Sequence, residues 1–268
     1  MFDVQLNPGP NGPRRALLRE PSGLDESFCV REDPVLASEL IGRLLVVVES
    51  DPSLQKDVWS LSIAERDRLV AELYSRCYGD NIDAVVSCGG CNKTFSLGFS
   101  LAGLVANRSE MTPERATITG PDEQGVYHLQ DGSSFRLPTA GDERFLRGTA
   151  PARSARALLE RCVKSGDVEG SAEQVQQAME LVAPVLSLDL PTTCPLCGHE
   201  QEVPFDLVGF FMAALLRERP LLFREVHCLA RAYRWSHAEI LALPRTERRA
   251  YVALVLQEYE AQRGGAFS

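Results

Sequence analysis

The sequence has no long apolar run and no export signal. Aliphatic stretches such as Leu44–Val48 fall far short of the roughly 18 consecutive apolar residues that a membrane-spanning helix needs. The first residues, Met1–Leu6, lack a basic segment followed by an apolar one, so they are unlike a secretory signal. We therefore expect a cytoplasmic protein with no membrane among its partners.

The signatures of common catalytic sites are also missing. The sequence contains no glycine-rich phosphate loop, no Gly-x-Ser-x-Gly elbow and no His-Glu-x-x-His motif. Four histidines in 268 residues leave little material for a general base beside a nucleophile. We therefore expect a protein that is not an enzyme and has no small-molecule substrate.

Lysine is scarce, and positive charge is concentrated near the carboxyl terminus. Only three of the 28 basic residues are lysines, and the net charge is −9 with a pI of about 5.1. An acidic chain is poorly suited to bind nucleic acid or an anionic membrane. Between Arg217 and Arg249, however, eight arginines stand against four glutamates. For the chain as a whole we expect no nucleic-acid partner.

Eight cysteines in a chain without an export signal indicate metal ligands or buried thiols rather than disulfides. Four of them form two Cys-x-x-Cys pairs, Cys88 with Cys91 and Cys194 with Cys197. Four thiolates are the ligand set of a closed, tetrahedral structural zinc site. The run Cys-Pro-Leu-Cys-Gly-His also resembles the knuckle of a zinc ribbon. The other four cysteines are interpreted as buried packing residues.

The two pairs are offset by 106 residues, so the sequence allows more than one arrangement. Both pairs can share one zinc, each can bind its own ion with extra ligands, or the thiols can carry no metal. Separate ions would need further ligands such as His128 or His199. One structural zinc, shared by Cys88, Cys91, Cys194 and Cys197, is the simplest arrangement and the one we predict.

An internal duplication surrounds the cysteine pairs. At a constant offset of 106 residues, CGGCNKTFSLGFSL at 88–101 matches CPLCGHEQEVPFDL at 194–207. Asn92 and Gly198 fall at the same place after each pair, and both tolerate the left-handed backbone of a tight turn. A second similarity precedes the first in both halves, because 19–26 and 136–143 share the pattern Arg-x-Pro-Ser/Thr-x-x-Asp-Glu.

Each half is predicted to contain a β-hairpin, then helices, then its knuckle. The expected hairpins pair Phe2–Leu6 with Arg15–Arg19 and Val126–Gln130 with Ser134–Leu137. Capping boxes, Ser62 with Glu65 and Ser171 with Gln174, are expected to open helices. The predicted fold is α+β: two duplicated hairpin–helices–zinc-knuckle repeats, 1–110 and 111–208, share a four-cysteine site and precede an all-α carboxyl-terminal region, 209–268.

The carboxyl-terminal region is expected to form helices separated at Pro220, at Trp235-Ser236 and at Pro244. The pattern superficially resembles a helix-turn-helix, but its arginines at 219, 224, 231 and 234 do not form a single recognition face. An amphipathic helical cap and a protein-docking surface are the two alternatives. The mixture of aromatic residues and arginine is enriched at protein interfaces, and the predicted partner-binding residues are Phe223, Arg231, Tyr233, Arg234 and Trp235.

Several of these segments together resemble a known family. They are the run at 19–26, Leu-Ser-Ile-Ala-Glu-Arg-Asp at 61–67, the two knuckles, and Glu-Val-His-Cys-Leu-Ala-x-x-Tyr-x-Trp-Ser-x-x-Glu-Ile-Leu-x-Leu-Pro at 225–244. The sequence is similar to the baseplate hub assembly chaperones of contractile phage tails and contractile injection systems. The segment at 225–244 is the most specific part of this resemblance.

The resemblance implies a non-enzymatic cytoplasmic factor that binds baseplate hub or spike proteins during assembly. It supplies no catalytic residues. Two other functions remain open at this point: a zinc-ribbon regulator that binds nucleic acid, and a permanent structural subunit of the baseplate.

Overall fold

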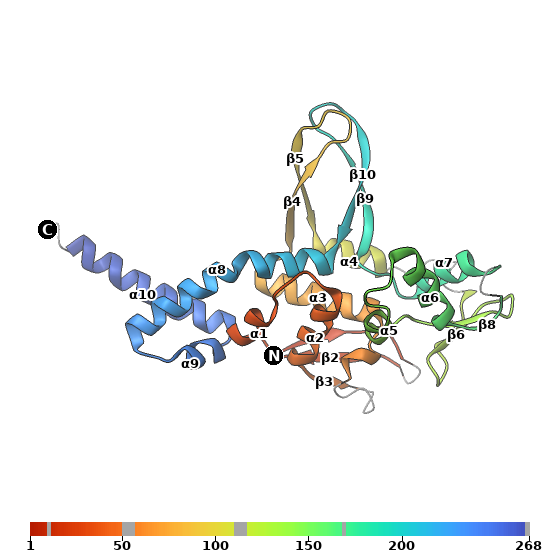
Figure 1. Ribbon diagram of the computed structural model, residues 1–268, viewed down its shortest axis with the longest axis horizontal. Coiled ribbons are helices and arrows are strands. Elements are labelled where there is room, and N and C mark those ends of the chain that lie inside the picture. The colour runs from red at the N-terminus through yellow and green to blue at the C-terminus, as the bar shows by residue number, and fades with distance from the viewer. Residues whose placement is uncertain (10–11, 50–56, 110–116, 168–169, 266–268) are drawn as a thin grey trace.

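The computed structural model describes residues 1–9, 12–49, 57–109, 117–167 and 170–265, and within them one order of elements occurs twice (Figure 1). The first repeat comprises β1 (Phe2–Gln5), β2 (Arg15–Leu18), α1 (Gly23–Phe28), α2 (Pro34–Leu44), β3 (Leu45–Glu49), the short 3₁₀ helix η2 (Val58–Ser60), α3 (Ile63–Tyr78), β4 (Asn81–Ser87), β5 (Thr94–Ser100) and α4 (Leu101–Ser109). The second comprises β6 (Val126–His128), β7 (Ser134–Arg136), α5 (Ala140–Phe145), α6 (Pro151–Cys162), β8 (Val163–Ser165), α7 (Ala172–Val182), β9 (Ser187–Thr193), β10 (Glu200–Asp206) and α8 (Leu207–Tyr233). The predicted α+β duplication is therefore confirmed.

The opening hairpin of each repeat supplies two strands of a three-stranded antiparallel sheet, and a third strand pairs with the second one. The sheet orders are β1-β2-β3 and β6-β7-β8, and the predicted hairpins are both present. The third strands, β3 and β8, had not been predicted. In β3, Val48 is buried opposite Ala16, whereas exposed Val46 is the unpaired residue of a β-bulge, where the register shifts between Leu17 and Leu18.

The helix that follows each small sheet begins differently in the two repeats. At α3 the predicted capping box is present: Glu65 N–H donates to Ser62 Oγ, and the Glu65 carboxylate accepts from Ser62 N–H. The capping box expected between Ser171 and Gln174 is wrong. Ser171, with φ −110° and ψ 6°, lies outside the extended region usual for a cap, and its hydroxyl donates to the carbonyl oxygen of Asp167.

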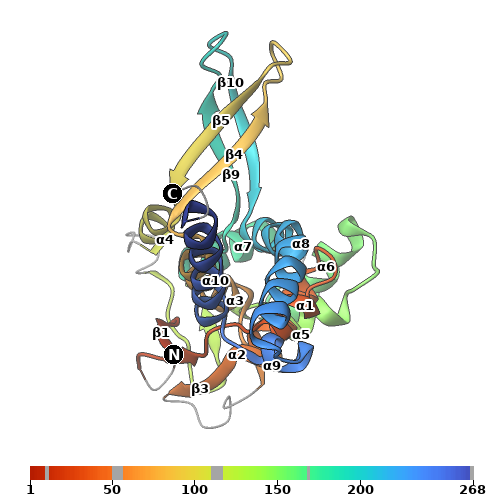
Figure 2. The same ribbon diagram turned by 90° about the vertical axis from the view of Figure 1, so that its left-hand side faces the viewer.

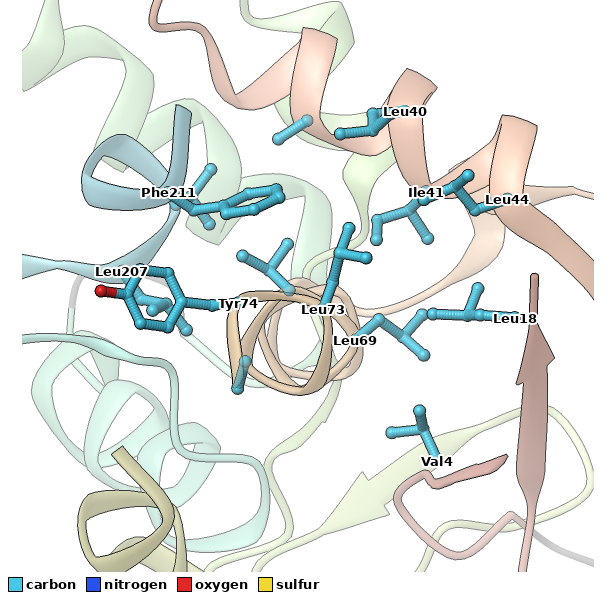
Figure 3. Close-up of a cluster of buried hydrophobic side chains, with 14 of the residues drawn as sticks. Val4, Leu18, Leu40, Ile41, Leu44, Leu69, Leu73, Tyr74, Leu207 and Phe211 are labelled. Carbon is cyan, nitrogen blue, oxygen red and sulfur yellow. The ribbon is translucent and has the colours of Figure 1, made fainter. Parts of the chain in front are cut away.

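The first repeat is completed by the beginning of α8. In α3, Tyr74 lies beside Leu207 and Phe211 of the first turns of α8, and Leu73 points toward α2 (Figure 3). Leu69 lies on the other side of α3, toward Leu18 of β2. A second, smaller core lies in the second repeat around Phe135. Because α8 follows β10 as α4 follows β5, the second repeat supplies a structural part of the first.

The carboxyl-terminal region contains one helix fewer than expected. Pro220 does not break α8, so the prediction of two helices separated there is wrong. A proline inside a helix costs about 3 kcal/mol, but buried packing on both sides, at Leu215 and Leu222, holds the helix together. Pro220 itself is exposed, so water can reach the carbonyl group that loses its partner.

After α8 come α9 (His237–Ala242) and α10 (Arg245–Gly265), close to the predicted boundaries. Along the ranges that the structure describes, no helix is both long enough and apolar enough to cross a bilayer. The predicted boundary between 110 and 111 lies outside the described residues. The division of the chain at 208 stays a prediction, with α8 beginning at Leu207.

The duplicated Arg-x-Pro-Ser/Thr-x-x-Asp-Glu motif forms the same charged corner twice. Arg19 donates to both carboxylate oxygens of Asp25, at 2.7 and 2.9 Å. Arg136 binds Asp142 in the same way, at 2.5 and 2.8 Å. Such bidentate pairs fix the geometry of the turn that precedes α1 and α5.

Each corner binds the first turns of a helix that is distant in the sequence. We call these two sets of contacts the first and the second latch. In the first latch, Arg245 N–H donates to the carbonyl oxygen of Pro21 and Arg248 binds Glu26, so α10 is attached to the first repeat. In the second latch, residues at the start of α3 make the corresponding contacts with the second repeat: Ile63 N–H with Pro138, and Arg66 with Glu143. The latches join the repeats to each other and the end of the chain to its beginning.

Candidate metal centre

The two long hairpins, β4–β5 and β9–β10, project together from the body as a single arm (Figures 1 and 2). In each hairpin the side chains alternate between exposed and partly buried. The partly buried faces meet, as the edge-to-face contact between Phe99 and Phe205 at the base of the arm shows, with ring centroids 5.1 Å apart. The cysteine pairs lie at the tip.

At the tip the four sulfur atoms of Cys88, Cys91, Cys194 and Cys197 lie within 4.8 Å of one another. Cys88 Sγ is 3.6 Å from Cys197 Sγ, and Cys91 Sγ is 3.9 Å from Cys194 Sγ. Sulfurs bound at about 2.3 Å to a central ion are about 3.8 Å apart at tetrahedral angles. The two pairs therefore form one shared four-cysteine site that could hold one metal ion.

Each knuckle is shaped by a residue with positive φ. Asn92 has φ 56° and Gly198 has φ 73°, which agrees with the left-handed conformation expected at both positions. Each of these residues donates its N–H to the carbonyl oxygen of the first cysteine of its pair, at 2.9 Å. The turns bring the two cysteines of each pair to the same side.

Backbone N–H groups favour a thiolate in the first knuckle. The N–H groups of Cys91 and Gly90 point to Cys88 Sγ and lower the pKa of Cys88 to about 6. At Cys197 the N–H of His199 lowers the pKa, but desolvation and the neighbouring sulfurs outweigh it and raise the pKa to about 12. Four thiolates side by side repel one another, so a cation at their centre is required to hold all four at neutral pH.

His199 and Gln201 support the tip without being part of the sulfur cluster. A Cβ atom added to Gly90 would lie only 2.8 Å from Cγ of His199, so the imidazole packs against the first knuckle. Gln201 accepts from Gly89 N–H at 2.9 Å and donates to the Ser87 carbonyl oxygen at 3.2 Å. Sequence reasoning missed this bridge, because nothing in the spacing of Gln201 relates it to the opposite hairpin.

The expectation that the remaining four cysteines are buried holds for two of them. Cys29 and Cys162 are buried, and Cys77 and Cys228 are partly buried. Burial raises the pKa of Cys29 to about 12 and the pKa values of Cys77 and Cys162 to about 11. A protonated, buried thiol is a poor nucleophile and a poor metal ligand.

The predicted partner-binding residues divide into two groups at the far end of α8. Phe223, Arg231 and Arg234 are exposed. Tyr233 and Trp235 are half-buried and stack on each other with ring centroids 4.8 Å apart. Both rings also contact Tyr251 of α10, so they hold α8, α9 and α10 together.

Comparisons of the chain with protein-family models, with curated proteins and with solved structures give no match. Function is therefore inferred from the residues of this chain.

Proposed function

We propose that the protein is a non-enzymatic assembly chaperone for the baseplate hub or spike of a contractile phage tail or phage-tail-like injection system. It acts in the cytoplasm by binding protein. The observation that carries this proposal is the helical end formed by α8, α9 and α10, which projects from the body (Figure 1). At least half of the surface of three apolar side chains is exposed there, at Phe223, Leu254 and Leu256.

The most specific segment of the family resemblance, 225–244, forms part of this helical end. Tyr233 and Trp235 form the aromatic stack at the end of α8, and Ser236 with Glu239 forms the capping box of α9. Pro244 then pairs with Ser22 of the first repeat. The signature thus corresponds to one structural unit, which supports the resemblance on which the proposal rests.

The ion of the four-cysteine site is proposed to be zinc, with a structural role. Four thiolates match the preference of zinc in closed sites, which leave no coordination position for a water or substrate. The ion joins Cys88 and Cys91 of the first repeat to Cys194 and Cys197 of the second. It therefore keeps the two hairpins of the arm in a fixed relation, and no chemistry is assigned to it.

The charge on the arm argues against a zinc-ribbon regulator that binds nucleic acid. The outward residues of β9–β10 include four acids and no lysine or arginine: Asp189, Glu200, Glu202 and Asp206. Phosphate backbones are bound by cations, so this face would repel them. Protein binding by the helical end is the function that the surface supports best.

The test is recovery of baseplate components by the tagged full-length chain from cells that express the genes of a contractile tail. Hub or spike protein should be recovered by the wild type and lost with Phe223→Asp, which changes an exposed side chain. Val85→Asp is the matched control, because Val85 is also exposed but lies on the arm.

Two outcomes would contradict the proposal. Recovery of no hub or spike protein would exclude the assignment to baseplate assembly. Presence of the chain in purified mature particles, in a fixed ratio to the hub, would make it a permanent subunit instead of a chaperone.

A further inference from the structure

Three arginines follow the exposed face of α8 at heptad spacing, Arg217, Arg224 and Arg231. Seven residues of α-helix rise about 10.5 Å and fall about 20° short of two full turns. The three side chains therefore begin from a nearly straight line about 21 Å long. We call these three residues the arginine row.

The arginine row has no acidic partner among the residues that the structure describes. The two glutamates of α8, Glu218 and Glu225, lie on another face and bind arginines of α10. An exposed row of cations without counter-charges is unusual in a chain with a net charge of −9. The row thus offers a surface for a negatively charged partner.

The positions between the arginines show what shape that partner has. Leu221, which is 43% exposed, and the half-buried Cys228 lie four residues after Arg217 and Arg224. The resulting steps of four and three residues are those of a seam between two helices packed side by side. A helix lying along α8 would bury Leu221 and bring its own side chains opposite the arginines.

We infer that α8 docks an acidic, amphipathic helix of the partner protein, with carboxylates opposite Arg217, Arg224 and Arg231. This inference rests on the proposed function and names the chemistry of the partner surface. Guanidinium groups match carboxylates in bidentate geometry, which fixes the register of the two helices.

The direct test uses labelled helical peptides three heptads long with the full-length protein. In one peptide, leucine and glutamate alternate at positions spaced four and three residues apart, so that both lie on one face of the helix. The other peptide has lysine in place of each glutamate. Fluorescence anisotropy should show binding of the glutamate peptide and no comparable binding of the lysine peptide. The affinity should fall at about 1 M salt, where charges are screened beyond about 3 Å.

The variant Arg217→Glu, Arg224→Glu, Arg231→Glu separates the row from the overall charge. Each exposed ion pair changes affinity by about 1.4- to 5-fold, so the loss of all three pairs should weaken binding at least about threefold. The matched control is Arg15→Glu, Arg153→Glu, Lys164→Glu, which changes the net charge equally at exposed positions elsewhere. The control should bind the glutamate peptide as the wild type does.

The inference would be overturned by equal binding of the two peptides, by equal weakening in the control, or by tighter binding of duplex DNA than of the glutamate peptide. Self-association of the chain that is lost in the triple variant would likewise assign the row to a second copy. The proposed function is tested separately by recovery of hub or spike protein. Recovery that persists in the triple variant would refute the docking site and leave the assembly role standing.

Discussion

Replacing Cys194 by serine should remove the single metal ion and loosen the arm. The ion joins two knuckles that are far apart in the sequence: Cys91 and Cys194, whose sulfurs lie 3.9 Å apart, are separated by 103 residues. Serine is a poor ligand for zinc because its hydroxyl is not ionised at neutral pH. Three sulfurs would remain, and the site would no longer be closed.

The size of the effect follows from the chain that the ion closes. A cross-link around a loop of about 100 residues stabilises by about 4.7 kcal/mol through the entropy of the unfolded chain. If the contact between Phe99 and Phe205 persists, the loop shrinks to the arm segments 91–99 and 194–205, for which the same relation gives about 3 kcal/mol. The free energy of unfolding should therefore fall by about 3 to 4.7 kcal/mol.

Metal content and urea unfolding of the purified full-length chain measure both quantities. The wild type should contain one zinc per chain, and Cys194→Ser should contain none. Hydrogen exchange should accelerate in β4, β5, β9 and β10 before it does in α3. Cys228→Ser, a change at a half-buried cysteine outside the cluster, is the control and should keep its zinc. Two ions per wild-type chain, or an unaltered ion in Cys194→Ser, would refute the shared site.

Three further predictions concern the latches and the knuckles. Arg248→Met should lower the free energy of unfolding by about 1.5–3 kcal/mol in urea titrations, because the carboxylates of Glu26 and Glu225 each lose one of their two arginine partners while Arg245 and Arg249 remain; a loss near zero would contradict the role given to the first latch. Burial raises the pKa of Asp142, but Arg136 and the other donors around it outweigh this and hold the pKa well below its usual range. The stability from Asp142 is therefore present above about pH 4 and is lost on acidification, so Asp142→Asn should reduce the difference in stability between pH 7 and pH 3; an unaltered difference would refute this. Gly198→Val should weaken zinc binding at least about fivefold because it strains a left-handed turn, whereas Gly198→Asn should be close to wild type, since Asn92 occupies the same place in the other knuckle; equal affinities of the two variants would count against that reasoning.

The duplicated features could be predicted because each repeat provides a second observation of the same pattern. One cysteine pair alone does not show whether the chain binds one ion or two. Two pairs at equivalent positions of the repeats, however, provide the four thiolates of one tetrahedral site. The left-handed turns at Asn92 and Gly198 follow from local chemistry and were also correct. The conformation of a residue can be predicted from the sequence when it depends on neighbours in the same turn or strand.

The features that were missed depend on contacts between distant segments. Pro220 should end a helix by local rules, yet α8 continues because its two halves are held by separate hydrophobic clusters. Ser171 has the right neighbour for a capping box, but its hydroxyl bonds Asp167 instead. The bridge from Gln201 to the opposite hairpin became visible only in three dimensions, and the arginine row depends on the continuity of α8 through Pro220.

The first latch also sets an order of events during synthesis. Glu26 and Arg248 are 222 residues apart. Because ribosomes add about 5–20 residues each second, Arg248 is synthesised roughly 10–45 s after Glu26. The second latch closes sooner, because Arg66 and Glu143 are only 77 residues apart. A nascent chain can thus join its two repeats while the corner at Glu26 is still open. Only a chain translated as far as α10 can close that corner, so the first latch distinguishes products that stop before α10 from products that include it.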